Sequence, residues 1–456
     1  MNFWMIIIWT LLSSLLSYLR VKYNYWDLQG VKQLKPHFLL GHLGKLKSVN
    51  HRQVLKEVYD NFKSTTKLAG FYIYTKPVAV ILNLDLVKAV LIKDFSFFAS
   101  RMVYKNEKDI LSQHLFNLGA PQWRPLRNKL SPAFTSGKMQ FMFPCIQRVA
   151  DNYVKAFERG LEESESLDVY DLNGRFTVDV ISNCLFGFES NCLENPDEEF
   201  RQISKKILGR TDFGIKSYLF KTTYVDLMKY FGAKRFPQFI ENFFGRVVSE
   251  GFVEREKTNV VRNDFVDVLK EFRKSGELNL SNEQISAQFF VFFLAGFETS
   301  STAMSNLLFE LARHEDIQTK LRQHIKEVLK RHDNTLSYES LVDMKYLDQV
   351  ITETLRLYPA LAFLQRVALE DYKIPNSDIT IEKNTEIFIP VQAIHHDPEI
   401  YENPKEFQPD RFTPSEETKR HSQAFLGFGD GPRNCIGLRF GRMQMKIGLI
   451  TLLMKF

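Results

Sequence analysis

The residues around Cys435 are those in this chain best suited to carry chemistry. The run from Phe428 to Gly437 reads FGDGPRNCIG, and its glycines and proline favour an irregular loop that can approach another group closely. Backbone N–H groups free of regular structure can point at a sulfur, and Arg433 lies nearby. Both features favour a thiolate, the form of cysteine that attacks substrates or binds a metal ion. The plain alternative is a buried thiol with no function, because free cysteine behaves as a small apolar residue.

A second group of reactive side chains lies midway along an apolar segment. Ser281 and Gln284 fit the capping box that starts a helix, and apolar residues then continue to Leu311. About thirty residues at 1.5 Å each give a helix on the order of 45 Å, long enough to cross a whole core. Glu298 and Thr299 lie in its middle, where they can supply an acid and a hydroxyl for proton transfer.

Two further residue pairs have plain alternatives. Glu353 and Arg356 lie three positions apart and share one face of a helix predicted over Tyr346 to Leu357. On a solvated surface such a pair adds little to the stability of the fold. This helix is otherwise apolar, however, which favours a buried, structural pair. His395 and His396 suggest a metal site at first sight. Adjacent side chains cannot easily face one ion, so we interpret both as structural.

The composition favours one large globular unit. The chain has 456 residues, of which 44% are hydrophobic and 40 are phenylalanine, and no flexible linker divides it. The net charge of +6 is mild, and no basic stripe with interleaved aromatic residues argues for nucleic acid. The four cysteines form no CxxC motif. Neither a zinc ribbon nor a disulfide framework is therefore expected, and a reducing compartment is the default.

The first residues form a separate apolar segment. Phe3 to Leu19 are almost wholly apolar, near the lower end of the roughly 17 to 25 residues that span a bilayer. Arg20 and Lys22 follow this run, whereas a signal peptide would carry positive charge before it. We expect residues 1–21 to be a transmembrane signal anchor, with one domain over residues 30–456 on its cytoplasmic side. A cleaved signal peptide or an interfacial helix is the alternative.

Helices dominate the rest of the pattern, and the predicted strands are short. Further helices are expected at Asp85–Lys93, at Trp123–Val149 with breaks near Pro132 and Pro144, at Glu315–Arg331 and from Leu438 onward. Strands are expected at Tyr72–Tyr74, Val78–Leu82, Val367–Leu369, Ile379–Ile381 and Glu386–Val391. The sequence thus predicts a mostly α domain with a small β region.

The chain resembles the cytochrome P450 superfamily. That family's haem-binding signature, Phe-x-x-Gly-x-Arg-x-Cys-x-Gly, is met by Phe428, Gly431, Arg433, Cys435 and Gly437. The acid–alcohol run of the long helix, the Glu-x-x-Arg pair and a Pro-Asp-Arg-Phe segment follow the family's order, although the family often has glutamate where this segment has aspartate. The resemblance covers the whole chain and is strongest to microsomal arthropod enzymes that oxidise foreign compounds.

The resemblance implies the cytochrome P450 fold, a helical bundle around haem with a small β region. It implies haem b (iron protoporphyrin IX) with the Cys435 thiolate as axial ligand of the iron. The implied activity is monooxygenation, in which one oxygen atom of dioxygen enters an apolar substrate such as a xenobiotic, a plant toxin, an insecticide or a lipid-like compound. The implied electron donor is the NADPH-dependent cytochrome P450 reductase, with cytochrome b5 as a further partner. The implied location is the endoplasmic reticulum membrane, with no nucleic-acid partner.

The resemblance also assigns roles to single residues. Glu298 and Thr299 become the proton-delivering pair, and Gly296 beside them is interpreted as a helix distortion that makes room for dioxygen, with helix packing as the alternative. Contacts to the haem or its propionates are implied for Arg101, Trp123, Arg127, Arg366, Phe428, Arg433 and Gly437. Support behind the haem is implied for Glu353, Arg356 and Arg411. Pocket positions by analogy are Phe116, Phe213, Ala295, Phe297 and Phe363. Basic residues expected to face the reductase are Lys129, Lys138, Arg439, Arg442 and Lys446.

Two rival functions remain open at this point. The chain ends at Phe456, 21 positions after Cys435, where relatives continue, so an incomplete sequence is expected. A truncated relative that binds haem or ligand without turnover is therefore one rival. The other is a haem-thiolate isomerase or dehydratase that acts on peroxides. Glu298 and Thr299 argue against it, because that chemistry needs no proton relay.

Overall fold

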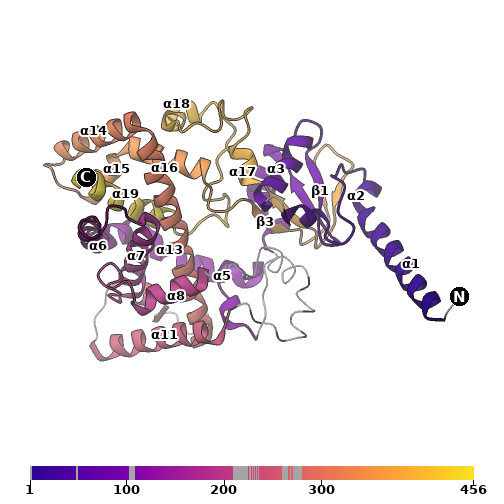
Figure 1. Cartoon of the computed structure of the whole chain (residues 1–456), viewed down its shortest axis with the longest axis horizontal. Coiled ribbons are helices and arrows are strands. Elements are labelled where there is room, and N and C mark those ends of the chain that lie inside the picture. Colours follow the sequence, from indigo (N-terminus) through magenta and orange to yellow (C-terminus); the bar gives the residue numbers. More distant parts are fainter. Residues whose placement is uncertain are drawn as a thin grey trace.

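Helices make up most of the structure, and two small β-sheets complete it (Figure 1). The structure is a computed structural model that describes residues 3–47, 50–101, 108–208, 236–258, 265–267, 269–270 and 280–456, with the single residues 224, 227, 230, 232 and 234. The predominance of helix agrees with the sequence-based expectation.

The elements of the described residues have the following bounds. The longer helices are α1 (Phe3–Tyr23), α3 (His51–Phe62), α5 (Ala120–Leu130), α6 (Ser136–Glu163), α7 (Val169–Ile181), α8 (Glu199–Leu208), α11 (Gln238–Thr258), α13 (Asn282–Arg313), α14 (Glu315–Arg331), α16 (Lys345–Leu357) and α19 (Leu438–Lys455). The shorter helical segments are α2 (Tyr25–Leu28), η1 (His42–Lys47), α4 (Leu84–Lys88), η2 (Ala89–Lys93), η3 (Phe95–Phe98), η4 (Ile110–Ser112), η5 (Ser131–Phe134), η6 (Ser182–Phe186), α15 (Tyr338–Asp343), α17 (Val391–His395), η8 (Pro409–Phe412) and α18 (Pro414–Glu417). The strands are β1 (Leu68–Ile73), β2 (Lys76–Ile81), β3 (Leu364–Val367), β4 (Tyr372–Lys373), β5 (Thr380–Ile381) and β6 (Glu386–Ile389).

Helix α13 runs through the centre of the helical part. The Ser281 side chain accepts from the Gln284 N–H, and the Gln284 side chain accepts from the Ser281 N–H, so the predicted capping box is present. The helix continues for 32 residues and packs against α7, α11, α16 and α19 (Figure 1). Its phenylalanines, among them Phe289 and Phe293, lie in the larger apolar core. This burial fixes the residues of α13 relative to the surrounding helices.

A second apolar core surrounds the four-stranded sheet. The strand order is β1-β2-β6-β3, with β2 and β6 parallel and the outer pairs antiparallel. Pro77 lies in β2 opposite Tyr72, before the parallel pairing with β6 starts, and a proline without an N–H fits a strand at such a place. An isolated β-bridge joins Ser100 to Val367 of β3. It brings the neighbouring residues Arg101 and Arg366 close together.

Helix α1 contacts the core around the sheet at its last residue, Tyr23, and most of the helix lies apart from both cores. In Figure 1 it extends away from the sheet region, with the N-terminus at its far end. The helix is long and apolar enough to cross a membrane, and only 6% of its most apolar stretch is buried in the protein. Trp4 is 72% exposed and Trp9 is 63% exposed. A helix with apolar side chains exposed on all sides needs an apolar surrounding, which agrees with the anchor expected over residues 1–21.

Some element boundaries differ from the sequence prediction. Helix α6 continues through Pro144, where a break was expected. A proline deprives the carbonyl four residues earlier of its helical partner, but that residue, Gln140, is exposed, and water can replace the lost N–H. The helix expected over Asp85–Lys93 divides into α4 and the π-helical η2. Strand β3 begins at Leu364, ahead of the predicted start at Val367.

Candidate functional site

The cysteine loop joins the sheet region to α19. It starts after the buried Leu426, and the Cys435 N–H donates to the Phe428 carbonyl at 2.9 Å. The Gly437 N–H hydrogen-bonds the Cys435 sulfur, and the Cys435 side chain reaches solvent. Because α19 begins at Leu438, the sulfur lies beside the N-terminal end of that helix, as the sequence predicted.

Two glycines of the loop have different surroundings. Gly431 has a φ of +72°, and a Cβ built on it would lie 1.9 Å from the carbonyl oxygen of Leu91 in η2. Any side chain at Gly431 would therefore push the loop off η2. At Gly437, by contrast, a Cβ would meet no heavy atom within 4 Å. The loop is thus packed tightly at Gly431 and open at Gly437, next to the sulfur.

Arg101 and Arg127 hold the backbone of the loop from outside. The Arg101 guanidinium donates to the carbonyl of Arg433 at 2.8 Å. Arg127 donates to the carbonyl of Asn434 at 3.0 Å and to its side-chain oxygen at 2.9 Å. All three bonds fall on the two residues that precede Cys435, so these arginines restrict the position of the sulfur.

Arg433 and Arg366 are buried beside this pair. Arg433 donates to the carbonyl of Leu118 at 2.7 Å, and its guanidinium lies 4.3 Å from the centre of the Trp123 ring. Trp123 therefore contacts Arg433 directly. Arg366 donates to the carbonyl of Gln365 at 2.8 Å. The Nε atoms of Arg366 and Arg433 are buried without a hydrogen-bond partner.

The four arginines form a positive cluster. Burial lowers the pKa of Arg101 well below its ordinary value, and the charges of the other three lower it further. Burial likewise lowers the pKa of Arg433 to about 9 and that of Arg366 to about 10. Among the described residues, no carboxylate forms an ion pair with Arg101, Arg127, Arg366 or Arg433. Buried cations without a counter-charge are costly, so the cluster fits an anionic group, and arginine forks suit carboxylates.

Opposing effects act on the pKa of the Cys435 thiol. Burial raises the pKa of the thiol, and it outweighs the Gly437 N–H and the charges of Arg127 and Arg101, which lower the pKa. The expected backbone N–H at the sulfur is present at Gly437, but the charges that lower the pKa come from Arg127 and Arg101, and not from Arg433. The residue is exposed to solvent, and the protein atoms packed around the thiol still make burial the largest effect on its pKa. A metal ion would supply the missing stabilisation, because a coordinating thiol loses its proton.

The middle of α13 has an accessible face near the start of α19. Ala295 and Thr299, one helical turn apart, are exposed although the residues around them are mostly buried. The side-chain nitrogen of Gln444 in α19 donates to the Ser300 hydroxyl at 2.5 Å and fastens the two helices together. Because Cys435 lies just before α19, the thiol and this face of α13 belong to one region of the molecule.

Gly296 serves helix packing. A Cβ at this position would lie 2.2 Å from the Cδ1 atom of Ile181 in α7. Helix α13 is continuous over the whole run from Ala295 to Ser300. The contact with Ile181 supports the packing alternative for Gly296, and the helix distortion stays a prediction. Accessible space beside α13 comes instead from the small Ala295 side chain.

Glu298 and Thr299 point to different neighbours. The Thr299 hydroxyl donates to the Ala295 carbonyl at 2.6 Å. The Tyr170 hydroxyl of α7 lies 3.4 Å from both carboxylate oxygens of Glu298. Burial raises the pKa of Glu298, whereas the Tyr170 hydroxyl and the charge of Arg201 lower it. Sequence reasoning missed Tyr170, because no local pattern connects residues 128 positions apart.

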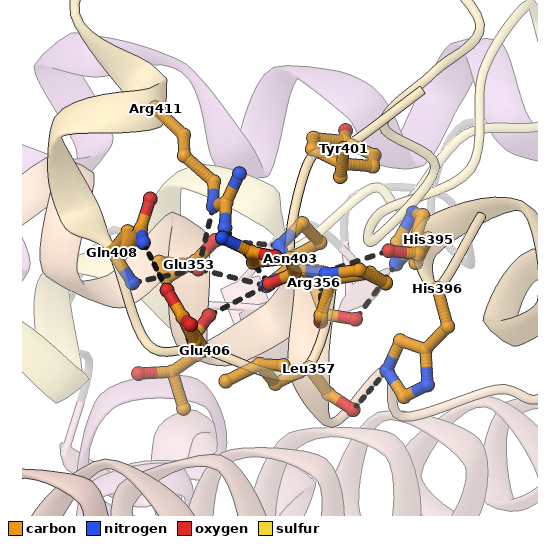
Figure 2. A network of polar contacts seen from close by, with 12 residues as sticks. Glu353, Arg356, Leu357, His395, His396, Tyr401, Asn403, Glu406, Gln408 and Arg411 are labelled. Carbon is orange, nitrogen blue, oxygen red and sulfur yellow. Dashed lines mark hydrogen bonds and ion pairs between the residues drawn. The ribbon is translucent and has the colours of Figure 1, made fainter. Parts of the chain in front are cut away.

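Glu353 and Arg356 form a fully buried ion pair on α16 (Figure 2). The Arg356 Nε lies 2.6 Å from one carboxylate oxygen of Glu353, and a terminal nitrogen lies 2.8 Å from the other. The remaining N–H groups donate to the carbonyls of His395, Pro404 and Glu406. Every N–H donor of the guanidinium therefore has an acceptor, which allows the pair to be buried. The apolar character of the helix indicated this burial.

Arg411 extends this network, and its neighbour Asp410 does not. Arg411 is 9% exposed, and its Nε lies 3.4 Å from the Glu353 carboxylate (Figure 2). The Gln408 N–H donates to the same carboxylate at 2.9 Å. Asp410, where the family often has glutamate, faces outward and pairs with Lys320 of α14 at 2.9 Å. The departure at this position therefore leaves the buried network unchanged.

The residues suggested for a substrate pocket fall into three groups. Ala295 is exposed, Phe116 is 38% exposed and Phe363 is half-buried, so all three are accessible. Phe297 is fully buried in the phenylalanine-rich core, and its assignment to a pocket is wrong. Two residues along a helix amount to a turn of about 200°, so Phe297 faces away from Ala295. Phe213 lies outside the described residues.

The basic residues expected on a docking face are only partly on the surface. Lys446 is 6% exposed and lies 2.8 Å from the Asp348 carboxylate. Arg442 lies 3.3 Å from the same carboxylate and donates to the Thr352 hydroxyl at 3.0 Å. Both residues connect α19 to α16, and their assignment as free surface charges is wrong. Arg439 is exposed, as expected.

These features together define a class of enzyme that holds an anionic cofactor against a cysteine ligand. A family model described as Cytochrome P450 matches residues 31–456. Cytochrome P450 6a8 of Drosophila melanogaster is 42% identical to this chain, with 98% of the chain and 91% of that protein covered. Cytochrome P450 6A1 of Musca domestica is 40% identical, with 98% and 90% covered. The chain belongs to the cytochrome P450 family.

Membership confirms the resemblance, the fold class and the type of enzyme expected from the sequence. Cytochromes P450 are oxidoreductases, haem-thiolate monooxygenases that work with a redox partner, and an apolar N-terminal helix agrees with the membrane anchor of microsomal members. The residues present fit a haem. Cys435 offers an accessible thiol, Gly437 borders open space, and the arginine cluster matches the two carboxylates of protoporphyrin.

Proposed function

We propose that this protein is a membrane-anchored monooxygenase that inserts one oxygen atom of dioxygen into an apolar substrate, with electrons from NADPH delivered by a reductase. The observation that carries the proposal is the accessible Cys435 thiol, whose pKa is lowered by the nearby charges of Arg127 and Arg101. Among the described residues, these two arginines form no ion pair with a carboxylate. Cys435 is the proposed axial ligand of the haem iron. Bound there, haem supplies the redox chemistry that activates dioxygen, aided by electron donation from the thiolate.

The residues around Cys435 have proposed holding roles. Arg101, Arg127, Arg366 and Arg433 bind the propionates, and Trp123 orients the Arg433 fork by lying against it. Gly437 leaves room for the flat macrocycle, and Phe428 accepts the Cys435 N–H through its carbonyl. Glu353, Arg356 and Arg411 hold the segment behind the loop in place. In these roles the residues bind and orient the cofactor without reacting.

Two spectroscopic and kinetic measurements test this function. The reduced, carbon-monoxide-bound protein is expected to show the absorption band of a thiolate-ligated haem. With an NADPH-dependent reductase, apolar test compounds are expected to give hydroxylated products that incorporate oxygen from dioxygen. A protein that shows the band but consumes no NADPH with reductase, and instead rearranges peroxides, would be an isomerase. A protein without the band would contradict the ligand assignment.

Thr299→Ala is expected to uncouple oxygen consumption from product formation. The Thr299 hydroxyl is held at 2.6 Å from the Ala295 carbonyl on the accessible face of α13, where a proton donor is required. Without it the product formed per NADPH should fall about ten-fold or more, and hydrogen peroxide should rise correspondingly. Thr299→Ser retains a hydroxyl and serves as the control, with near-normal coupling. Equal coupling in both variants would remove Thr299 from proton delivery.

We propose that the reductase docks near the exposed Arg439 of α19 and Arg124 of α5. Arg439 donates to the Phe134 carbonyl of η5, the turn that follows α5, so the two charges lie on neighbouring elements. Charges at an interface rim act mainly on the association rate and weaken with salt, over a Debye length of about 10 Å at 0.1 M.

Reversing Arg124 and Arg439 to glutamate is expected to lower reductase-supported turnover several-fold at low salt, an effect on the order of 1 kcal/mol. The difference from the unaltered protein should shrink as salt is added. Peroxide-driven turnover bypasses the reductase and should remain unchanged. A parallel fall of both activities would assign the two arginines to the fold or to haem binding.

The proposed location is the endoplasmic reticulum membrane, with the domain of residues 30–456 on the cytoplasmic face. Deletion of residues 1–21 is expected to weaken membrane association without abolishing it, as measured by flotation with liposomes. Exposed apolar side chains outside residues 1–21 support the remaining association: Phe38 is 57% exposed, Leu39 is 47% exposed and Tyr230 is 84% exposed. Adding Phe38→Ser and Leu39→Ser to the deletion should release the protein. Full solubility of the simple deletion would exclude the second contact.

The proposed substrate is an apolar organic compound, such as a xenobiotic, a plant toxin, an insecticide or a lipid-like molecule. The accessible positions Ala295, Phe116 and Phe363 carry apolar side chains, which suits such a ligand. The guanidinium of Arg101 lies 4.0 Å from the centre of the Phe116 ring, so Phe116 borders the arginine cluster. Cytochrome b5 is a further proposed electron donor.

A further inference from the structure

His395 lies between α16 and the cysteine loop. It is fully buried, and its ring stacks on Phe425 with centres 5.3 Å apart and planes only 4° from parallel. Its Nδ1 lies 3.1 Å from the carbonyl oxygen of Arg356 (Figure 2). Its Nε2 lies 2.8 Å from the backbone nitrogen of Leu426. The ring therefore connects two segments that are far apart in the sequence.

The two partners fix the tautomer of this histidine. A backbone N–H can only donate, so Nε2 must be the acceptor of the Leu426 N–H. Nδ1 must then carry the proton and donate it to the Arg356 carbonyl. Burial lowers the pKa of His395 to about 3, so the ring stays neutral near neutral pH. Neither ring nitrogen is free for a metal ion or for proton transfer.

The contact with Arg356 is reciprocal. The guanidinium of Arg356 donates to the His395 carbonyl at 2.8 Å, while the His395 ring donates to the Arg356 carbonyl. His395 is thus attached twice to the residue that closes the buried ion pair with Glu353. Its position is as well defined as that of the network itself.

On its other side, His395 fixes Leu426, the residue after which the cysteine loop starts. Leu426 donates to the ring through its N–H and accepts the Gly429 N–H at 2.9 Å through its carbonyl. Phe428, inside that turn, accepts the Cys435 N–H at 2.9 Å. A continuous series of hydrogen bonds and short backbone links therefore leads from Arg356 through His395 to the backbone of Cys435.

We propose that His395 is a positioning residue for the cysteine ligand, which fixes the start of the Cys435 loop to the Glu353–Arg356 ion pair. This inference rests on the proposed role of Cys435 as the haem ligand. Without the ring acceptor, the buried Leu426 N–H loses its partner, and the turn that holds Cys435 loosens. The expected consequence is an easier loss of the iron–sulfur bond in protein that is still folded.

The neighbouring His396 provides a matched control. Its Nε2 lies 3.0 Å from the carbonyl of Leu357, the residue after Arg356 on the same helix. Among the described residues, its ring forms no hydrogen bond with the cysteine loop. Each ring thus contacts one backbone carbonyl of α16 (Figure 2), and only the His395 ring also contacts Leu426.

The experiment compares His395→Leu with His396→Leu in haem-loaded protein. The thiolate band of the reduced carbon-monoxide complex is followed during mild heating, with loss of haem recorded separately. His395→Leu is expected to lose the thiolate band about ten-fold faster than the unaltered protein, the factor for one lost buried hydrogen bond. His396→Leu should lose it at the unaltered rate. Equal rates in both variants would overturn the proposal.

Two conservative variants and a second readout keep the test informative if His395→Leu does not fold. The amide oxygen of glutamine reaches about as far as Nε2, so His395→Gln can still accept the Leu426 N–H, whereas the shorter His395→Asn cannot. His395→Gln is expected to be closer to the unaltered protein than His395→Asn. Hydrogen exchange of the backbone amides 426–435, measured before and after haem loading, should be faster in His395→Asn alone. The reverse order would contradict a role through Leu426.

The outcomes also separate this inference from the proposed function. If the unaltered protein lacks a thiolate band, or if the band persists in Cys435→Ser, the ligand assignment fails and the inference fails with it. If the band depends on Cys435 but is equally durable in His395→Leu and His396→Leu, only the role of His395 fails. Faster band loss in His395→Leu together with faster amide exchange in His395→Asn supports both the ligand assignment and the role of His395.

Discussion

Replacing Cys435 by serine is expected to abolish the thiolate band of the reduced carbon-monoxide complex, together with NADPH-supported product formation. A serine hydroxyl stays protonated near neutral pH and cannot donate electron density as a thiolate does. The loop should keep its shape, because the Cys435 N–H bond to Phe428 belongs to the backbone and Gly431 still packs on η2. The variant therefore isolates the contribution of the sulfur atom.

Cys145→Ser is the matched control for this experiment. Cys145 is a half-buried free thiol, and a hydrogen bond from Cys184, with help from Arg148, lowers its pKa to about 7. By pKa alone Cys145 would be the stronger candidate for a thiolate, because burial raises the pKa of Cys435. Cys145→Ser is nevertheless expected to keep the band. Loss of the band in Cys145→Ser, with retention in Cys435→Ser, would make Cys145 the ligand and refute the proposed site.

Replacing Arg356 by leucine is expected to destabilise the folded domain by about 3–5 kcal/mol. The variant leaves the Glu353 carboxylate buried without its main counter-charge, and the carbonyls of His395, Pro404 and Glu406 lose a donor. Urea unfolding followed by circular dichroism measures the effect as a lower midpoint. Arg356→Lys should restore little of the loss, because one ammonium group cannot replace a bidentate fork.

The nearby pair of Lys320 and Asp410 is the control for Arg356→Leu. Its side chains are 53% and 67% exposed, and its two atoms lie 2.9 Å apart. Lys320→Met should change the free energy of unfolding by less than about 1 kcal/mol, because water replaces the lost partner. Similar destabilisation by Lys320→Met and Arg356→Leu would mean that burial adds nothing to the Glu353–Arg356 pair.

The sequence predicted what depends on local patterns. The capping box at Ser281, the shared helix face of Glu353 and Arg356, and the irregular loop around Cys435 all follow from residues within a few positions of one another. Such patterns determine local hydrogen bonds and helix ends, so a single sequence reveals them. The same local logic located the apolar helix at the N-terminus.

Features that depend on distant partners were not predictable in this way. Phe297 was misplaced because the sequence gives the helix but not which face points to the core. Arg442 and Lys446 look like surface charges until Asp348, about a hundred positions earlier, is brought beside them. The charge state of Cys435 depends on how much water the folded protein excludes, which no local pattern reports.

The close approach of Gly296 to Ile181 has a consequence for how this chain can vary. The two residues, on α13 and α7, share a single volume, because a Cβ at position 296 would lie 2.2 Å from the end of the Ile181 side chain. Alanine at 296 therefore requires either another rotamer of Ile181 or a smaller residue there. A larger residue at position 296 is therefore expected to occur together with a smaller residue at position 181, and a larger residue at 181 together with glycine at 296.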